Sequence, residues 1–219
     1  IKERYYDINL LEDYTEEEWD KINKFVDHRR DEDFTYAAME QFRGKYLVQN
    51  RVTGEIKETP QVAYILISAT LFSNYPKETR LQWVKDYYDA ISKFYISLPT
   101  PVMAGVRTPQ RQFSSCVLIE TDDSLDSINA TTSSIVKYVS QKAGIGIGAG
   151  SIRALGSPIR HGDAYHTGVI PFYKMFQSAT RSCSQGGVRN GAATLYYPLW
   201  HLEVEDLLVL KNNKGTEDN

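Results

Sequence analysis

The second half of the chain alternates short β-rich runs with helical runs, starting at about Gln112. Because strand–helix–strand order favours a parallel sheet, this half is expected to form an α/β unit. The expected strands cover residues 113–120, 143–149 and 192–197, and the expected helices cover about 124–142, 172–182 and 203–212. The segments 151–168 and 183–191 are rich in glycine and are expected to be loops.

The first half has a purely helical pattern. Thr15 and Glu18 have the spacing of a capping box, and the apolar residues Trp19, Ile22, Phe25 and Val26 follow at the spacing of one helix face. A second apolar helix is expected over residues 62–73. A third is expected to start after Pro76 and to carry one apolar stripe from Leu81 to Tyr95. This half is expected to be a packing unit without catalytic residues.

Composition excludes several classes of protein. The 219 residues carry 25 Lys and Arg against 28 Asp and Glu, a net charge of −3, which gives no support to a nucleic-acid partner. No apolar run reaches the roughly 18 residues of a membrane span, and the acidic first twenty residues do not resemble a signal peptide. Two cysteines exclude a disulfide scaffold and indicate a reducing compartment, so a cytoplasmic location is expected.

Glycines alternate at positions 144, 146, 148 and 150. Alternate residues of a strand point to one face, so that face would lack side chains. Either another backbone packs closely there or a ligand lies there. The run also satisfies GxGxxA by letter, but a dinucleotide-binding fingerprint must leave a strand and open a helix, whereas these glycines follow a helix and form the strand.

A second glycine cluster covers residues 182–191. Gln185 and Arg189 could present an amide and a guanidinium group to a planar or phosphorylated ligand. The alternative is a flexible turn with a solvated arginine.

The cysteines and histidines leave several interpretations open. Cys116, in an apolar strand, is either a small buried hydrophobe or a reactive thiol at a polar strand start. A disulfide between Cys116 and Cys183 is possible, although the sequence alone cannot show whether their Cα atoms lie within the roughly 7 Å that a disulfide requires. His161 and His166 are a weak metal signal, and solvated loop histidines are the expected state, with no metal site.

Taken together, these motifs resemble a known family. The strings TPQRQFSSCVLIETDDSLDS, KAGIGIGAGSIRALGSPIRHGDAYHTG and SCSQGGVRNGAATLYYPLWH resemble the large (R1, α) subunit of class I ribonucleotide reductase. The match is to the bacterial and phage type, which reduces ribonucleoside diphosphates. The resemblance implies a helical N-terminal region over residues 1–112, followed over residues 113–219 by the opening strands and helices of a ten-stranded α/β barrel.

The resemblance assigns a substrate site. Cys116 matches the cysteine that reduces substrate and becomes half of a redox disulfide. Thr100 and Ser115 match residues at the substrate, and the backbone of Ala143 and Gly144 matches a segment that passes close to the ribose. Gln185 and Arg189, in the second specificity loop, would contact the base.

The resemblance also assigns an effector site for deoxynucleoside triphosphates or ATP. Asp123, Ser124 and Leu125 match the start of the helix that binds the effector at a dimer interface, and Ser140 lies later on that helix. The matching first specificity loop runs from Arg153 to Arg160 and includes Ile159. Guanidinium groups are well suited to effector phosphates.

The implied partners follow from the family. They are a second large subunit, a small metal-containing subunit that supplies the radical, thioredoxin or glutaredoxin as reductant, and the remaining part of the large subunit. The family's radical cysteine and the partner of Cys116 would lie beyond Asn219, so the chain is expected to be an incomplete subunit, inactive alone. The alternatives are a non-catalytic nucleotide-binding or assembly module, or a plain structural domain with a buried Cys116.

Overall fold

A computed structural model describes residues 5–183 and 191–210. The chain divides into two compact units, Ile1–Ser115 and Cys116–Asn219, and each is considered by itself. No helix among the described residues is both long and apolar enough to cross a bilayer.

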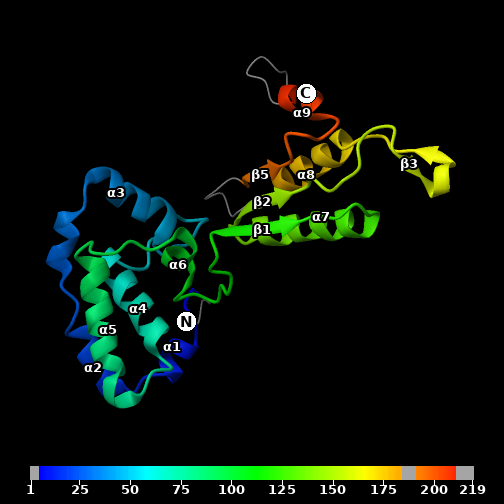
Figure 1. Cartoon of the computed structure of the whole chain (residues 1–219). Helices are drawn as coiled ribbons and strands as arrows, with labels where there is room; N and C mark the ends of the chain where they lie inside the picture. The colour runs from blue at the N-terminus through cyan, green and yellow to red at the C-terminus, as the bar shows by residue number, and fades with distance from the viewer. Residues whose placement is uncertain (1–4, 184–190, 211–219) are drawn as a thin grey trace. The chain divides into compact units, whose positions relative to one another are not determined.

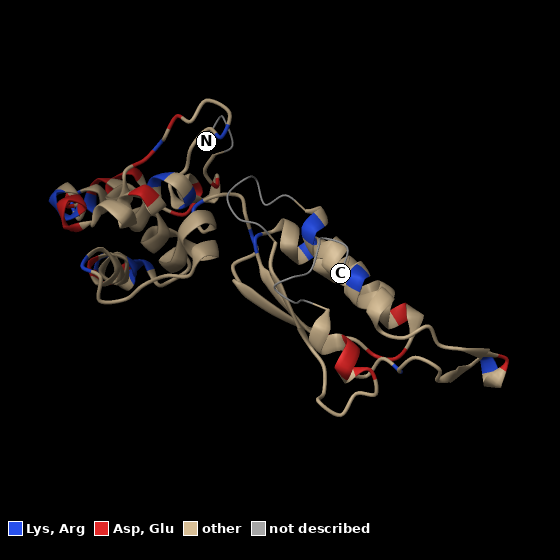
Figure 2. Cartoon of the chain, turned by 90° about the horizontal axis from the view of Figure 1, so that it is seen from above, with Lys and Arg blue, Asp and Glu red and all other residues tan. Residues whose placement is uncertain are grey.

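The regular elements described in the first unit are all helical, apart from one isolated β-bridge between Gln49 and Ile56. Its elements are α1 (Asn9–Glu12), α2 (Glu16–Asn23), a 3-10 turn η1 (His28–Asp33), α3 (Tyr36–Gln41), a π-turn η2 (Phe42–Tyr46), α4 (Pro60–Phe72), α5 (Lys77–Ser92) and α6 (Thr100–Gly105). The capping box expected at Thr15 is present, since its hydroxyl accepts from the Glu18 backbone and the Glu18 carboxylate accepts from the Thr15 backbone. Acidic and basic residues are interspersed along the helices of this unit (Figure 2).

The apolar α4 and the longer α5 form the centre of the helical core. Tyr88 and Ile91 of α5 are buried against α4, as the expected stripe required. Two details of the expectation are wrong. The α2 helix ends at Asn23, so Phe25 and Val26 reach the core from the following turn, and α5 ends at Ser92, which leaves Tyr95 exposed.

A buried ion pair ties the end of α6 to the segment before α4. The Arg107 and Glu58 side chains are fully buried, and Arg107 Nε donates to Glu58 Oε2 at 2.9 Å. The same guanidinium donates to the carbonyl oxygens of Met103 and Tyr46, at 2.6 and 2.9 Å. The carboxylate also accepts from the Val48 backbone amide at 2.7 Å. These bonds compensate the cost of removing both charges from water.

The second unit is built on a parallel sheet with the strand order β1-β2-β5 (Figure 1). Its strands are β1 (Cys116–Glu120), β2 (Gly144–Gly148) and β5 (Ala193–Tyr196), and its longer helices are α7 (Leu125–Ser140) and α8 (Ile170–Ser182). A short helix α9 (Val204–Val209) follows β5. The expected order of strands and helices is confirmed, and the strands pair in parallel.

Only one face of this sheet is covered by helices. Val117, Ile119, Ile145 and Ile147 pack in the core that contains α7 and α8. The helix α7 begins because Ser124 accepts a hydrogen bond from the Ser127 backbone amide, which satisfies one free N–H group of the first turn. The sheet therefore presents its opposite face, the one that carries the alternate glycines, without a helix over it in the described residues.

The segment 151–168, expected to be a loop, contains a small hairpin. Strands β3 (Pro158–Ile159) and β4 (Ala164–Tyr165) pair antiparallel and are joined by the 3-10 turn η3 (Arg160–Gly162). We call residues 151–168 the hairpin loop.

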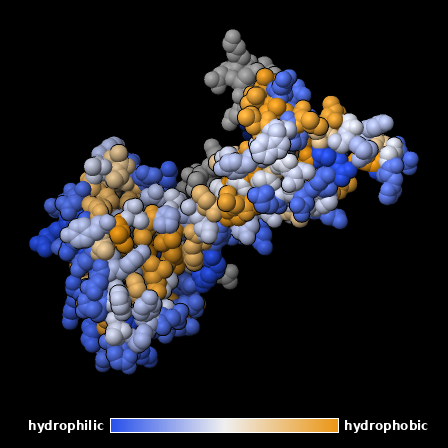
Figure 3. Space-filling view, in the orientation of Figure 1, coloured by the Kyte–Doolittle hydropathy of each residue, from blue (hydrophilic) through white to orange (hydrophobic). Residues whose placement is uncertain are grey.

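Apolar side chains are exposed around α9, as the orange atoms in Figure 3 show. The exposed aliphatic residues there are Leu199, Leu202, Leu208 and Val209.

Candidate functional site

The parallel sheet separates the candidate residues into two groups. Cys116 and Gly144 begin β1 and β2 and are direct partners in the register. Asp123 and Arg153 follow the carboxyl ends of the same two strands. With about 3.3 Å per residue along a strand, the five-residue β1 keeps the two edges on the order of 13 Å apart. The sheet therefore has an amino edge and a carboxyl edge with different chemistry.

At the amino edge, the thiol of Cys116 is free and exposed. Cys116 shares the helix-free face of β1 with Leu118 and Glu120, because alternate residues point the same way. Leu118 is 80% exposed. The interpretation of Cys116 as a buried hydrophobe is therefore wrong, since it lies on the face opposite to the apolar core.

Gly146 and Gly148 lie on this same face, and side chains of the neighbouring strands lean over them. A Cβ atom on Gly146 would lie 2.6 Å from Leu118 Cδ2 and 3.3 Å from Tyr196 Cε2, and one on Gly148 would meet the Glu120 carboxylate. Among the described residues, no other backbone packs closely against these two glycines, which was one of the two expected explanations. Tyr196 is 57% exposed, so this flexible cover can be displaced.

The remaining residues of the proposed substrate site are dispersed. Ser115 is half-buried and directly precedes Cys116, whereas Ala143 is buried in the apolar core, main chain included. Thr100, the first residue of α6, is half-buried in the helical unit. Gln185 and Arg189 lie outside the described residues.

No disulfide joins the two cysteines. Cys183 is a free, half-buried thiol at the end of α8, and its Sγ atom lies 3.6 Å from the Val136 carbonyl oxygen. The Cys116 thiol is also free, so the possible Cys116–Cys183 bridge is not formed.

At the carboxyl edge, the side chains of Asp123 and Arg153 are in contact. Arg153 Nε donates to Asp123 Oδ2 at 2.7 Å, and the Arg153 backbone amide donates to Asp123 Oδ1 at 3.0 Å. Arg153 Nη1 donates to the Pro158 carbonyl oxygen at 3.1 Å. The carboxylate before α7 thus orients the first arginine of the hairpin loop. The Arg153 side chain stays 38% exposed and the Asp123 side chain 33% exposed.

The α7 residues are distributed along the helix. Ser124 caps its amino end, and Leu125 beside it is exposed. Ser140 is the last residue of α7, and its hydroxyl donates to the Lys137 carbonyl oxygen at 2.8 Å. At 1.5 Å per residue, Ser124 and Ser140 are about 24 Å apart along the axis. Within one chain they cannot contact the same nucleotide.

The hairpin carries the second expected arginine. Ile159 pairs with Ala164, and Arg160 opens the turn that follows. Arg160 and His161 both have positive φ angles, 50° and 58°, a conformation that side-chain-bearing residues adopt only at a cost. Arg160 is exposed. The tight turn therefore directs this arginine away from the sheet core.

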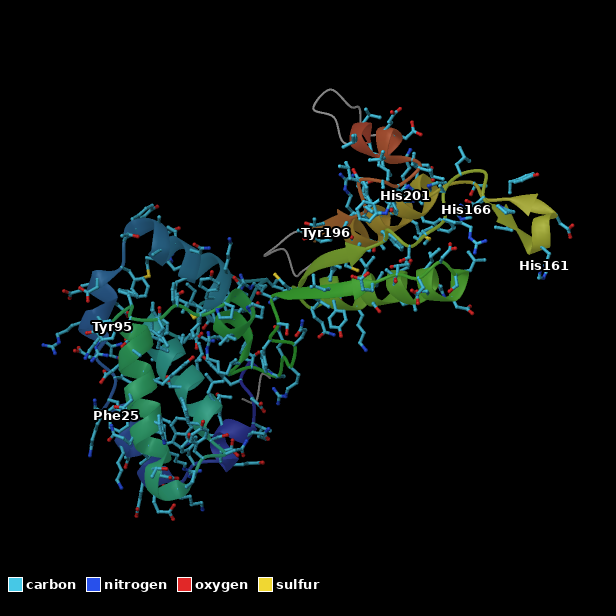
Figure 4. The ribbon with its side chains drawn as sticks, in the orientation of Figure 1. Phe25, Tyr95, His161, His166, Tyr196 and His201 are labelled. Carbon is cyan, nitrogen blue, oxygen red and sulfur yellow. The ribbon has the colours of Figure 1, made fainter. Side chains whose placement is uncertain are left out.

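The two loop histidines lie apart, with His161 at the tip of the hairpin and His166 nearer the helices (Figure 4). His166 stacks on Phe172 with 5.7 Å between ring centroids, and its Nδ1 accepts from the Gly168 amide at 3.1 Å. In the described part of the chain, no three His, Cys, Asp or Glu side chains gather as a metal ion would require.

Sequence reasoning missed two buried polar residues after β5. His201 and Glu203 contact backbone groups of the hairpin loop and of Val169, directly after it, across 34 to 49 positions of sequence. Burial, together with the Glu203 charge, raises the pKa of the nearby Tyr173 to about 12. The one available signal was a histidine and a carboxylate within an apolar segment, which does not by itself indicate a partner.

Comparison with known proteins shows the family to which this chain belongs. A model described as the all-alpha domain of ribonucleotide reductase matches residues 32–111, and one described as its barrel domain matches residues 114–219. The chain belongs to the ribonucleotide reductase large-subunit family. The expected helical region and opening of an α/β barrel agree with this assignment.

Within this family, the chain is most usefully compared with individual subunits of known name. The chain is 72% identical over its whole length to the ribonucleoside-diphosphate reductase subunit alpha of Haemophilus influenzae and covers 29% of that protein. Over 98% of the chain, it is 73% identical to subunit alpha of reductase 1 of Escherichia coli and 57% identical to subunit alpha of Enterobacteria phage T4, and it covers 28% of each. The chain thus spans less than a third of these curated relatives.

Proposed function

We propose that this chain is part of the large subunit of a ribonucleoside-diphosphate reductase, a cytoplasmic enzyme that makes deoxyribonucleoside diphosphates for DNA synthesis. Relatives that are 72% and 73% identical to the chain are named subunit alpha of such a reductase. Within that subunit, the chain would supply one redox cysteine at the amino edge of the sheet and a nucleotide-effector site at the carboxyl edge.

The reaction needs two thiols. Replacing the ribose 2′-hydroxyl by hydrogen takes two electrons and two protons, and the hydroxyl leaves as water. Two cysteine thiols supply both when they form one S–S bond. Cys116 would be one of them. The second thiol would come from the remaining part of the large subunit, the radical from the small subunit, and thioredoxin or glutaredoxin would reduce the disulfide again.

The position of Cys116 is the observation that carries this proposal. Its thiol is exposed and free, and its register partner is Gly144, which has no side chain to fill the space beside it. A ribose could therefore approach the sheet next to the thiol, close to the segment Ala143–Gly144. Thr100 and Ser115 would contact the substrate from the chain before β1, and Gln185 and Arg189 would contact its base.

The carboxyl edge supports an effector role. Arg153 keeps guanidinium N–H groups available beyond its bonds to Asp123 and Pro158, and Arg160 is exposed on the hairpin. Both would bind phosphates, while Asp123 and the α7 amino end would bind the ribose. Because Ser140 lies at the far end of α7, its contribution would come from the second large subunit of a dimer. Leu125 and Ile159 would line the same site.

The test reconstitutes the reductase from this chain, the remaining part of the large subunit, the small subunit and thioredoxin. Reduction of a nucleoside diphosphate is expected with the native chain and with the control Cys183→Ser, and it should be lost with Cys116→Ser. Undiminished activity of Cys116→Ser would exclude the redox role. Nucleotide binding without any reduction would instead favour a non-catalytic binding module.

A further inference from the structure

The segment between β5 and α9 forms hydrogen bonds with the backbone near the start of the hairpin loop and with Val169, directly after its end. His201 and Glu203 lie in this segment, and both are buried. Figure 4 places His201 close to α8 and α9. Neither residue belongs to the substrate or effector groups proposed above. Their partners are all main-chain atoms, so the contacts fix where the loop starts and ends rather than any of its side chains.

His201 holds the start of the loop. Its Nδ1 lies 3.1 Å from the Glu203 backbone N–H, which can only donate, so Nδ1 must be the acceptor. The neutral ring then carries its proton on Nε2, which lies 3.1 Å from the Ile152 carbonyl oxygen. That oxygen belongs to the residue directly before Arg153. The ring therefore forms two matched hydrogen bonds in one tautomer.

With one oxygen, Glu203 joins a residue near the start of the loop to the residue directly after its end. Its Oε2 accepts from the Leu155 amide at 2.9 Å and from the Val169 amide at 3.1 Å. Within the described ranges, no cation forms an ion pair with this carboxylate. A buried charge without a cation persists only when such hydrogen bonds satisfy it, so the two amides and the carboxylate depend on each other.

The fit at the end of the loop is close. Gly168 has a φ angle of +92°, and a Cβ atom there would lie 2.5 Å from Glu203 Oε1. A residue with a side chain could neither adopt this backbone conformation without strain nor leave room for the carboxylate. The loop is thus shaped around Glu203 as well as bonded to it.

We propose that His201 and Glu203 are positioning residues of the effector site, which hold the backbone on both sides of Arg153 and close the base of the hairpin loop. This inference rests on the effector role proposed for Arg153 and Arg160. Without the two contacts, the loop would sample several positions, and a deoxynucleotide would have to select the one in which both arginines reach its phosphates. Its apparent affinity would fall accordingly.

Two substitutions of Glu203 distinguish the effect of its side-chain length from the effect of its charge. Glu203→Asp keeps the charge but shortens the side chain by one methylene, so the carboxylate should lose its hydrogen bonds from the Leu155 and Val169 amides. Glu203→Gln loses the charge but keeps an oxygen at the same reach. In Glu203→Asp, we expect amide exchange at Leu155 and Val169 to accelerate at least about tenfold and dTTP binding to weaken by a similar factor. Glu203→Gln should remain close to the native chain in both.

The experiment uses the full chain, with residue-resolved amide exchange by NMR and dTTP titration by calorimetry. Glu205→Asp, on the exposed side of α9, is the matched control and should change neither quantity. The Ile145 and Ala149 amides, which bond across the sheet, report whether the fold is retained. Native exchange in Glu203→Asp would overturn the proposal, as would a loss in Glu203→Gln equal to that in Glu203→Asp.

Faster exchange with unchanged dTTP affinity would also overturn it, since the contacts would then serve the fold alone. A native chain that binds no dTTP would refute the proposed effector function itself. In that case the exchange measurements still decide whether Glu203 positions the loop, so the two failures are distinguishable.

Discussion

The carboxylate of Asp123 receives both the side chain and the backbone amide of Arg153, at 2.7 and 3.0 Å. A residue at the carboxyl edge of β1 thereby fixes the direction of an arginine that follows β2. Because the guanidinium is already oriented, a phosphate that binds it need not pay the full entropy of ordering a long side chain.

This arrangement predicts that Arg153→Ala weakens the binding of dTTP by roughly ten- to a hundredfold, the loss expected for charge-assisted hydrogen bonds to phosphate. Calorimetric titration of the full chain measures the effect. Arg181→Ala removes an exposed arginine at the end of α8 and serves as the control. An unchanged affinity in Arg153→Ala would remove this residue from the effector site.

The two thiols are expected to differ in reactivity. Cys116 is exposed at the start of β1, whereas Cys183 is half-buried beside the Val136 carbonyl oxygen. Under native conditions, iodoacetamide should modify Cys116 first, because access controls the rate when reagent is limiting. Peptide mass spectrometry over time gives both rates. Cys116→Ser should leave only the slower reaction, and a faster Cys183 would contradict the exposed position of Cys116.

Two glycine substitutions should differ in their cost to the fold. In Gly146→Ala, the new methyl meets the ends of the Leu118 and Tyr196 side chains, which are exposed and can move. In Gly191→Ala, it meets the Thr180 carbonyl oxygen and Val139 Cγ1. We expect less than about 1 kcal/mol for the first and about 1–3 kcal/mol for the second, measured by urea unfolding. An equal cost would mean that the glycine face is rigid.

The buried ion pair of the helical unit predicts a large stability effect. Arg107→Ala leaves the Glu58 carboxylate charged and buried, and the free energy of unfolding should fall by about 3–5 kcal/mol. Arg29→Ala removes a pair with Asp27 in which the arginine side chain is 86% exposed, so it should lower the free energy of unfolding far less than Arg107→Ala does. Chemical unfolding of the three chains compares them. A small loss in Arg107→Ala would show that the carboxylate takes up a proton or water instead.

Local patterns predicted the elements with strong periodicity. The helix α7 has a cap at Ser124 and an apolar stripe, and β2 has glycines at every second position, so both were predicted within two residues of their observed ends. The β3–β4 hairpin was missed because each strand is two residues long, too short to show alternation. Ends of helices also shifted where apolar residues continue past the last turn, as after α5.

The polar contacts of the site depend on tertiary structure. Nothing near His201 in the sequence indicates that its ring will meet Ile152, 49 positions earlier. The register that pairs Cys116 with Gly144 likewise arises only when α7 returns the chain to the sheet. The roles of the individual site residues came from the family resemblance and stay predictions.

The strand order β1-β2-β5 has a consequence for handling the protein. Both β1 and β5 are outer strands, and among the described residues neither has a second partner along its free side. Backbone groups on such borders readily recruit another strand, whether from the rest of a barrel or from a neighbouring molecule. Co-expression with the complementary polypeptide is therefore expected to raise the protein concentration at which this chain stays dispersed.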